Sequence, residues 1–333
     1  MKSGFAVFIR TLPLFAVLFA MALAGASLAL GQSDYPARPV KIVLPYPPGG
    51  TTDVVTRIYA KELGDSLGQQ FIIENRPGGG TNIGAEMVVR SAPDGYTLFV
   101  VQAASHGINP SLYRNLSYDP VKDFSAAGFM ARTAMFLVIN ASLPVTSVQG
   151  LVDYARANPG KLNFGSGGNG SPHHLAGALL KQRTGTNIVH VPYKGAVPAI
   201  VDLVAGRVQF TFLSLDGMVS NLVKEGKLKV LAVAASQRWP TEPQVPSMSE
   251  SGIADFEVLS FFGLSAPART PEPVLEKLNR VMVEVSKREE TKKRLADMGL
   301  VPMTGTRDEM TKFIVNEVEK WRPIVEAAGA KID

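Results

Sequence analysis

The chain contains no cysteine among its 333 residues. That absence excludes thiol catalysis, a disulfide framework, Cys-ligated zinc and a lipid-modified N-terminal cysteine. Histidine is also scarce, and two of the four residues, His173 and His174, are neighbours that would point about 100° apart on a helix. Such a pair is poor chelation geometry, so we expect no metal site. Lysine and arginine are scattered along the chain, and we therefore find no nucleic-acid footprint.

The long apolar run of this sequence stands at the N-terminus. Lys2 and Arg10 precede a nearly charge-free stretch over residues 11–30, and small residues near its end offer cleavage sites at Ala24-Gly25-Ala26 or Ala29-Leu30-Gly31. This order is typical of a secretory signal peptide. We expect residues 1–31 to be removed and the mature protein to be soluble in the periplasm. The alternative is an uncleaved membrane anchor, because about 20 apolar residues could just span a bilayer.

The rest of the chain alternates short apolar runs with amphipathic stretches, which predicts an α/β fold. A length of 333 residues favours two domains. Predicted strands cover residues 40–44, 71–74, 97–102, 136–139, 162–164, 187–191, 209–213 and 229–234. Predicted helices cover residues 54–67, 83–90, 148–157, 172–179 and 197–205, and most of the chain after residue 271.

Three of these strands run into a glycine-containing turn that precedes a helix. The turns are Pro48-Gly49-Gly50-Thr51, residues 165–171, and Tyr193-Lys194-Gly195. A helix N-terminus presents unpaired N–H groups and a partial positive charge, and glycine lets a ligand approach the backbone closely. Each turn alone could be an ordinary tight turn. Three of them at the carboxyl ends of strands predict an anion-binding cleft.

Catalytic motifs are incomplete in this sequence. Gly165, Gly167 and Gly170 have the spacing of a dinucleotide-binding loop, but the next strand does not end in the acidic residue that would hold a ribose. Ser166 and Ser171 lack the glycines of a nucleophile elbow. We therefore expect no enzyme and no cofactor. The alternative of a secreted hydrolase or oxidoreductase would need a catalytic constellation that these motifs do not supply.

Several single side chains have two interpretations each. Asp53 is predicted to cap the first helix, and the alternative is a ligand contact. Asp216 could contact a ligand or cap the helix after it. Tyr46 and Tyr193 could form walls of the cleft or belong to ordinary packing. His174 could donate a hydrogen bond toward the cleft or pack locally.

Short motifs in a fixed order run through essentially the whole mature chain. They include Tyr35-Pro36-Ala37-Arg38-Pro39-Val40, Pro45-Tyr46-Pro47-Pro48-Gly49-Gly50, Glu74-Asn75-Arg76-Pro77-Gly78, Ala92-Pro93-Asp94-Gly95-Tyr96, Asn158-Pro159-Gly160-Lys161-Leu162, Gly165-Ser166-Gly167-Gly168-Asn169-Gly170-Ser171 and His190-Val191-Pro192-Tyr193-Lys194-Gly195. Together they resemble the Bug, or TctC-like, substrate-binding proteins of tripartite tricarboxylate transporters.

The resemblance implies a two-lobed periplasmic binding protein fold of type II, with two crossover strands and a ligand cleft between the lobes. Residues 35–135 plus 251–333 would form lobe 1, and residues 136–250 would form lobe 2. The implied function is to capture a small carboxylate, such as a di- or tricarboxylate or an aromatic acid, by cleft closure. The protein would act as a monomer and deliver the ligand to membrane transporter subunits of the tripartite tricarboxylate type. The alternative is a periplasmic sensor that presents its ligand to a signalling partner.

The resemblance also assigns the ligand contacts to the glycine loops. Thr51-Thr52 and Leu213-Ser214-Leu215 are the segments where we expect ligand choice to be set. The expected ligand-binding residues are Tyr46, Pro48, Gly49, Gly50, Thr51, Asp53 and, more weakly, Ser105 in lobe 1, and Ser166, Gly167, Asn169, Gly170, Ser171, His174, Tyr193, Lys194, Gly195 and Asp216 in lobe 2.

Overall fold

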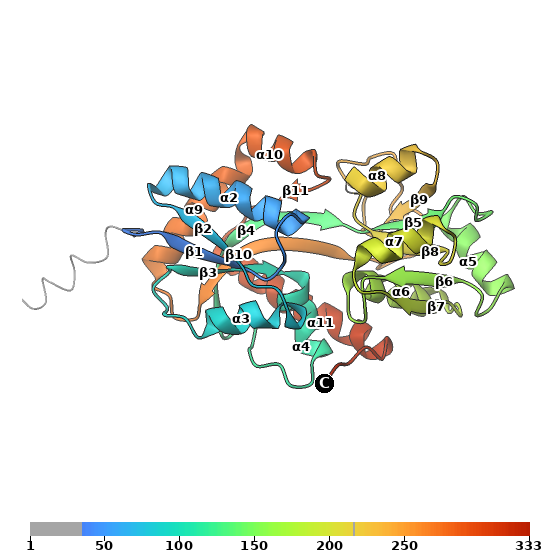
Figure 1. Ribbon diagram of the computed structural model, residues 1–333, viewed down its shortest axis with the longest axis horizontal. Coiled ribbons are helices and arrows are strands. Elements are labelled where there is room, and N and C mark those ends of the chain that lie inside the picture. Colours follow the sequence, from blue (N-terminus) through green and yellow to red (C-terminus); the bar gives the residue numbers. More distant parts are fainter. Residues whose placement is uncertain (1–34, 216) are drawn as a thin grey trace, which may run out of the picture. The chain divides into compact units, whose positions relative to one another are not determined.

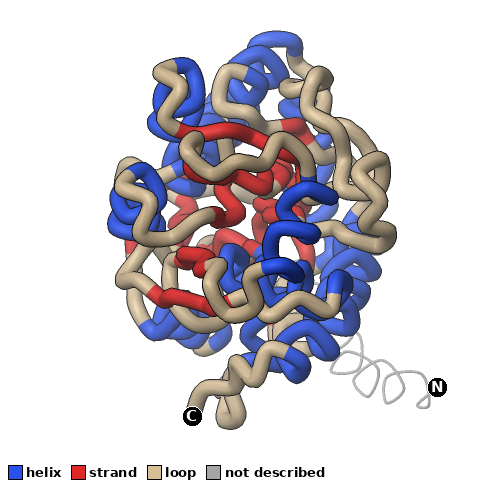
Figure 2. The backbone as a smooth tube through the Cα atoms, turned by 90° about the vertical axis from the view of Figure 1, so that its right-hand side faces the viewer, coloured by secondary structure: helices blue, strands red, loops and turns tan. Residues whose placement is uncertain are grey.

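Two β-sheets organise the chain. The structure is a computed structural model that describes residues 35–215 and 217–333, and the chain from Pro39 to Asp333 forms one unit. The predicted signal peptide and Asp216 lie outside the described residues. Strands occupy the interior of this unit, and helices and loops lie around them (Figure 2). None of the helices within the described residues is long and apolar enough to cross a bilayer.

The first sheet is built from the beginning and the end of the chain. Its six strands follow the spatial order β11 (Val301–Pro302), β4 (Phe124–Ala134), β10 (Leu259–Pro267), β3 (Thr97–Gln102), β1 (Val40–Leu44) and β2 (Phe71–Asn75). β1 is parallel to both neighbours, whereas β10 is antiparallel to β3 and β4. The apolar run of β1 is buried almost throughout, as expected for a parallel strand that is covered on both faces.

Helices on both sides cover this sheet. α2 and α3 lie on opposite sides of it in Figure 1. Val43, Phe99 and Phe261 belong to the core cluster between the strands and their helices. The helical elements of this part are α2 (Thr51–Leu67), η1 (Gly79–Thr81), α3 (Asn82–Val89), the π-helical turn η2 (Ala104–Ile108), α4 (Asn109–Leu112), α9 (Glu272–Lys287), α10 (Glu289–Ala296) and α11 (Arg307–Ala327).

The second sheet comes from the middle of the chain. Its five strands follow the spatial order β7 (Val189–Pro192), β6 (Asn163–Ser166), β8 (Phe210–Leu213), β5 (Phe136–Asn140) and β9 (Leu228–Val233). β6 is parallel to β7 and β8, while β5 is antiparallel to β8 and β9. The helices of this segment are α5 (Val148–Ala157), α6 (Pro172–Thr184), α7 (Ala196–Val204) and α8 (Gly217–Lys224).

The chain passes from one sheet to the other twice, and the two passages are hydrogen-bonded to each other. The first passage is Met135, between β4 and β5, and the second is the connection from β9 to β10. The N–H of Met135 donates to the Val258 carbonyl at 3.2 Å, and the N–H of Ala234 donates to the Met135 carbonyl at 2.7 Å. Two adjacent crossing segments are the feature that the predicted type II fold requires.

The C-terminal helix α11 contributes to the core of the second sheet as well as the first. Ile314 lies in the core cluster of the first sheet. Trp321 and Val325, farther along the same helix, lie in the cluster that contains Leu175 of α6. The last two turns of α11 therefore pack in the core that α6 shares with the second sheet.

Candidate functional site

The first glycine loop leads from β1 into α2. Gly50 is the N-cap residue of α2, with φ −80° and ψ 171°, and no side chain caps this helix start. The prediction that Asp53 caps the helix is wrong, because Asp53 is the third residue of α2. Among the described residues, no side chain accepts a hydrogen bond from the backbone N–H groups of the first turn.

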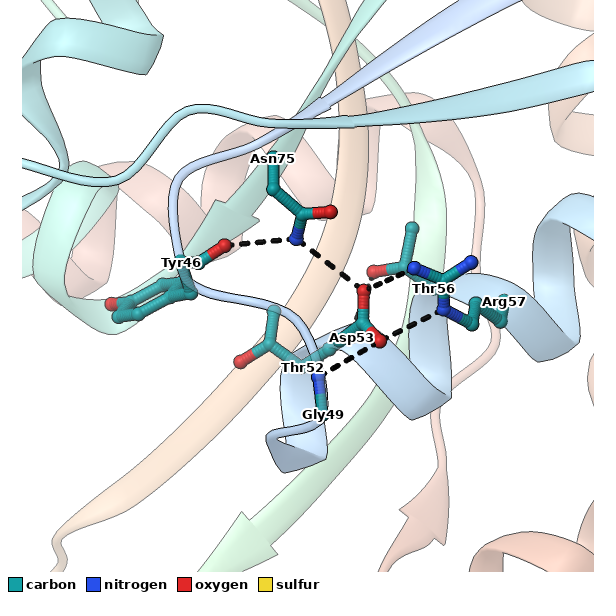
Figure 3. A network of polar contacts seen from close by, with 7 residues as sticks. All are labelled: Tyr46, Gly49, Thr52, Asp53, Thr56, Arg57 and Asn75. Atoms are coloured by element: carbon teal, nitrogen blue, oxygen red, sulfur yellow. Dashed lines mark hydrogen bonds and ion pairs between the residues drawn. The ribbon is translucent and has the colours of Figure 1, made fainter.

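Asp53 instead holds the loop in place (Figure 3). Its carboxylate is 4% exposed and accepts two hydrogen bonds from Arg57, at 2.8 and 2.9 Å. It also accepts the Gly49 N–H at 3.1 Å and the Asn75 amide at 3.4 Å, and the same amide donates to the Tyr46 carbonyl at 2.9 Å. The hydrogen bonds from Arg57, followed by those from Gly49 and Asn75, lower the pKa of the Asp53 carboxyl, although burial opposes the shift.

A further hydrogen bond joins the start of α2 to the end of β3. The Gln102 side-chain amide donates to the Thr52 hydroxyl. Ser105, in the π-helical turn after β3, is fully buried, and its hydroxyl lies 3.0 Å from Nδ1 of His106 and 3.3 Å from the Gln102 backbone. The Ser105 hydroxyl is therefore engaged within its own turn. Tyr46 is half-buried, and burial raises the pKa of its phenol.

The second glycine loop follows β6 and leads into α6. Ser166 is buried at the end of the strand, and its Oγ accepts the Gly168 N–H at 3.1 Å. The Gly170 N–H donates to Nδ1 of His174 at 3.0 Å. Ser171 is the N-cap residue of α6 and accepts the His174 N–H, and Pro172 occupies the first helical position, as predicted. This helix start is therefore capped by its own side chain.

The third loop leads from β7 into α7. Gly195 is the N-cap residue, with φ 112°, and no side chain caps α7. The Tyr193 hydroxyl donates to Asp202 at 2.7 Å, and burial, followed by this hydrogen bond, raises the pKa of Tyr193 to about 12. The Lys194 side chain and the first-turn residue Val197 are exposed. Like α2, α7 has a glycine as its N-cap residue, and its first N–H groups have no side-chain acceptor in the part of the chain that the structure describes.

The second and third loops pack against each other. A Cβ atom on Gly167 would lie 3.5 Å from the Ala196 nitrogen, and one on Gly168 would lie 3.3 Å from the Tyr193 carbonyl oxygen. The Tyr193 N–H also donates to the Ser166 carbonyl at 3.0 Å. Asn169 points to the surface as an exposed residue, and the exposed Pro48 stands in the first loop. Across the described residues, no hydrogen bond joins the first loop to the other two.

The comparisons with known proteins agree on one family. The family described as "Tripartite tricarboxylate transporter family receptor" matches residues 55–330. The chain belongs to this family. It is 34% identical to Protein BugT of Bordetella pertussis over 313 residues, which cover 94% of this chain and 96% of BugT. The predicted family membership is therefore confirmed.

Solved structures of similar receptors confirm the two-lobed fold. The R. palustris protein Rpa4515, solved with adipate, is 36% identical with a TM-score of 0.80, covering 90% of this chain and all of that one. MatC from Rhodopseudomonas palustris, solved with bound malate, is 31% identical with a TM-score of 0.75, covering 87% of this chain and 100% of MatC. BugD, described as a periplasmic binding protein, also has a TM-score of 0.75 at 31% identity. This receptor family comprises solute-binding proteins of transporters.

Four residues of the loop network were not predicted to have a role there. Arg57, Asn75 and Gln102 hold the first loop, and His190 lies 2.6 Å from the Ser166 hydroxyl in the second. The spacing of Asp53 and Arg57, four positions apart on a helix, is a signal that could have identified their pairing. The contacts of the other residues join positions far apart in the sequence and leave no local pattern.

Proposed function

We propose that this receptor binds a small carboxylate in the cleft between its lobes through the N-terminal N–H groups of α2 and α7. The observation that carries the proposal is that both helices begin on glycine, Gly50 and Gly195, without a side-chain cap. At α6, by contrast, the side chain of Ser171 already caps the helix. The family and its adipate- and malate-bound members support a carboxylate as the ligand.

The chemistry of the loops suits a carboxylate that is released again. Backbone donors at the start of a helix are fixed in direction and add the partial positive charge of the helix end. They stabilise an anion without burying a charged side chain, whose desolvation is costly. Lys194 in the third loop is exposed and stands two residues before Ala196, and no ion pair of Lys194 is found among the described residues. Its positive charge would attract an anionic ligand at long range.

Lobe 1 is proposed to comprise residues 35–135 plus 251–333, and lobe 2 is proposed to comprise residues 136–250. The paired crossing segments at Met135 and Val258 support a hinge there, because rotation about two adjacent segments would close the cleft over a ligand. The remaining expected contacts, Tyr46, Thr51 and Asn169 among them, are proposed as lining of that cleft, apart from Ser105, which is buried within its own turn. Asp216 is proposed as a contact from the second lobe.

The location and partners are also proposals. The apolar N-terminal segment supports export to the periplasm and cleavage near residue 31. The family description supports delivery of the ligand to the membrane subunits of a tripartite tricarboxylate transporter. We propose that the mature protein is a monomer without enzymatic activity.

The test is a substitution that fills the anion position with the protein's own carboxylate. A Cβ atom on Gly50 would meet nothing within 4 Å, and the φ of −80° suits any residue. In Gly50→Asp the new side chain would cap α2, compete for its N–H groups and repel an anion. We expect the affinity for adipate or malate, measured by calorimetry, to fall at least about 10-fold, the equivalent of one charge-assisted hydrogen bond.

Gly50→Ala is the matched control, because it adds a Cβ but no acceptor. It should weaken binding much less than Gly50→Asp does, and the melting temperature without ligand should not fall in Gly50→Asp, since aspartate is a good N-cap residue. Equal affinities for Gly50→Asp and Gly50→Ala would show that α2 does not hold the carboxylate.

A further inference from the structure

Two stacked imidazoles lie beneath the second glycine loop. His174 belongs to the first turn of α6 and His190 to the edge strand β7. Their ring centroids are 3.9 Å apart and their planes are inclined by only 11°. Phe164 of β6 lies against both rings, with its centroid 4.9 Å from that of His190 and 6.5 Å from that of His174. His174 is 6% exposed, so the pair fills the space between the loop and the strand.

His174 can hold the loop only as a neutral acceptor. The Gly170 N–H donates to its Nδ1 at 3.0 Å. Nδ1 must therefore carry a lone pair, and the ring proton stands on Nε2. Gly170 has φ 74°, and a Cβ atom there would lie 2.4 Å from Leu112, so the loop passes close to α4 at this residue.

His190 holds the other end of the loop through Ser166. Its Nε2 lies 2.6 Å from Ser166 Oγ, and that oxygen accepts the Gly168 N–H at 3.1 Å. The Gly168 carbonyl already accepts the Ser171 hydroxyl at 2.7 Å, compared with 3.1 Å from Ser166. The Ser166 hydroxyl has one proton and two acceptors within reach, and its contact with Nε2 of His190 at 2.6 Å is shorter than its contact with the Gly168 carbonyl at 3.1 Å. The distances therefore favour His190 as the acceptor, with its own proton on Nδ1.

We propose that His174 and His190 are positioning residues that hold the ligand loop through two neutral nitrogen acceptors, one at each end. The inference rests on the proposed function, in that it assumes that the loop from Ser166 to Ser171 contacts the ligand. The pair acts through the loop and need not touch the ligand. Each imidazole fixes one glycine N–H, directly at Gly170 and through Ser166 at Gly168.

The surroundings of the pair favour the neutral rings. Both rings line a cavity of about 480 Å³ on the side away from the loop, together with Lys181 of α6. Of the described residues that line it, Lys181 is the one with a permanent charge, and the end of α11 adds Ala327 and the C-cap residue Ala328. His173, the neighbour on α6, is a further titratable group near the loop, since a Cβ on Gly167 would lie 3.2 Å from its Nδ1. Tyr193 is another, since a Cβ on Gly165 would lie 3.5 Å from its ring. Burial, followed by the charge of His174, lowers the pKa of His190 to about 4, and burial lowers that of His174.

The test exploits the different shapes of asparagine and glutamine. An asparagine amide places its oxygen near the position of histidine Nδ1, whereas a glutamine amide reaches the position of Nε2. His174→Asn should therefore bind a carboxylate more tightly than His174→Gln, while His190→Gln should bind more tightly than His190→Asn. We expect roughly 5-fold differences, the equivalent of one neutral hydrogen bond, in calorimetry with the best of adipate, malate and related carboxylates.

Two readouts separate positioning from plain structural support. Imidazole ¹⁵N spectra of the ligand-free wild-type protein should show the Nε2–H tautomer for His174 and the Nδ1–H tautomer for His190. On acidification from pH 7 toward 4, wild-type affinity should fall more than that of the double variant His174→Asn/His190→Gln, in which the ligand and His173 titrate as before but neither imidazole of the pair does.

The outcomes distinguish this inference from the proposed function. If the wild-type protein binds no carboxylate, the proposed function fails, whereas the tautomers still report on the pair. If the wild-type protein binds a carboxylate, two results overturn the inference. One is that the same amide, asparagine or glutamine, gives the tighter binding at both positions. The other is that His174 carries its proton on Nδ1 or His190 carries its proton on Nε2. Melting temperatures of the four single variants show whether each is folded, and the reversed ranking cannot arise from a general loss of stability.

Discussion

At the residue scale, Asp53 shows how an acidic side chain near a helix start can hold the loop in place instead of contacting the ligand. Its two oxygens are occupied by Arg57, Gly49 and Asn75, so little of the carboxylate is left for another partner. The local pattern of an acid at a helix start predicts a cap. The N-cap residue is instead Gly50, three positions earlier, because α2 already begins at Thr51.

The Asp53–Arg57 pair should contribute measurably to stability. In Asp53→Asn the buried carboxylate loses its charge, and we expect the free energy of unfolding in urea to fall by about 1–3 kcal/mol. The control is Asp65→Asn on the same helix, where the Lys61–Asp65 pair has side chains 64% and 60% exposed and should contribute less than about 1 kcal/mol. Equal losses for the two variants would contradict the buried role of Asp53.

The same pair predicts the sign of a pH effect. The pKa of Asp53 is lowered in the folded protein, so its contribution is fully present above its ordinary pKa of 3.8 and is lost as pH falls through the lowered value. The difference in unfolding free energy between wild-type protein and Asp53→Asn should therefore be constant at neutral pH and shrink only in strong acid.

At the element scale, the sequence predicted the regular units better than the unusual ones. β1, β3 and α5 have the predicted bounds, because short apolar runs between turn residues and one amphipathic stripe are clear local signals. The long strands β4 and β10 were not predicted. Both strands are buried on both faces, so apolar and polar residues do not alternate along them. Each strand also contains a glycine, Gly128 or Gly263, at a point where a helix or the neighbouring strand approaches closely.

The start of α7 provides a direct test of the backbone donors. Proline is tolerated at the first position of a helix, where it removes an N–H that has no helical partner. Ala196 holds that position in α7. We expect Ala196→Pro to weaken carboxylate binding about 10-fold or more in calorimetry while the melting temperature changes little. Ala196→Ser keeps the N–H and is the control. Equal affinity in the two variants would argue against a ligand contact at this N–H.

At the scale of the whole molecule, the order of the short motifs along the chain explains why the family could be recognised before the geometry was known. Several of these motifs are loops that follow strand ends, such as the loops after β1, β6 and β7. What the sequence did not reveal is the way that loops are held by distant residues. His190 lies 24 positions from Ser166, and Gln102 lies 50 positions from Thr52, so only the folded chain brings them together.

The most direct test of the account is a thermal-shift screen of the mature protein, beginning at Asp34 and first unfolded and refolded to remove bound ligand. The panel should contain adipate, malate and other mono-, di- and tricarboxylates. A ligand that binds only the folded state stabilises it by about 2.7 kcal/mol at a hundredfold excess over Kd. The account predicts a rise in melting temperature of several degrees with at least one carboxylate. No rise with any of them, in protein shown to have refolded, would contradict it.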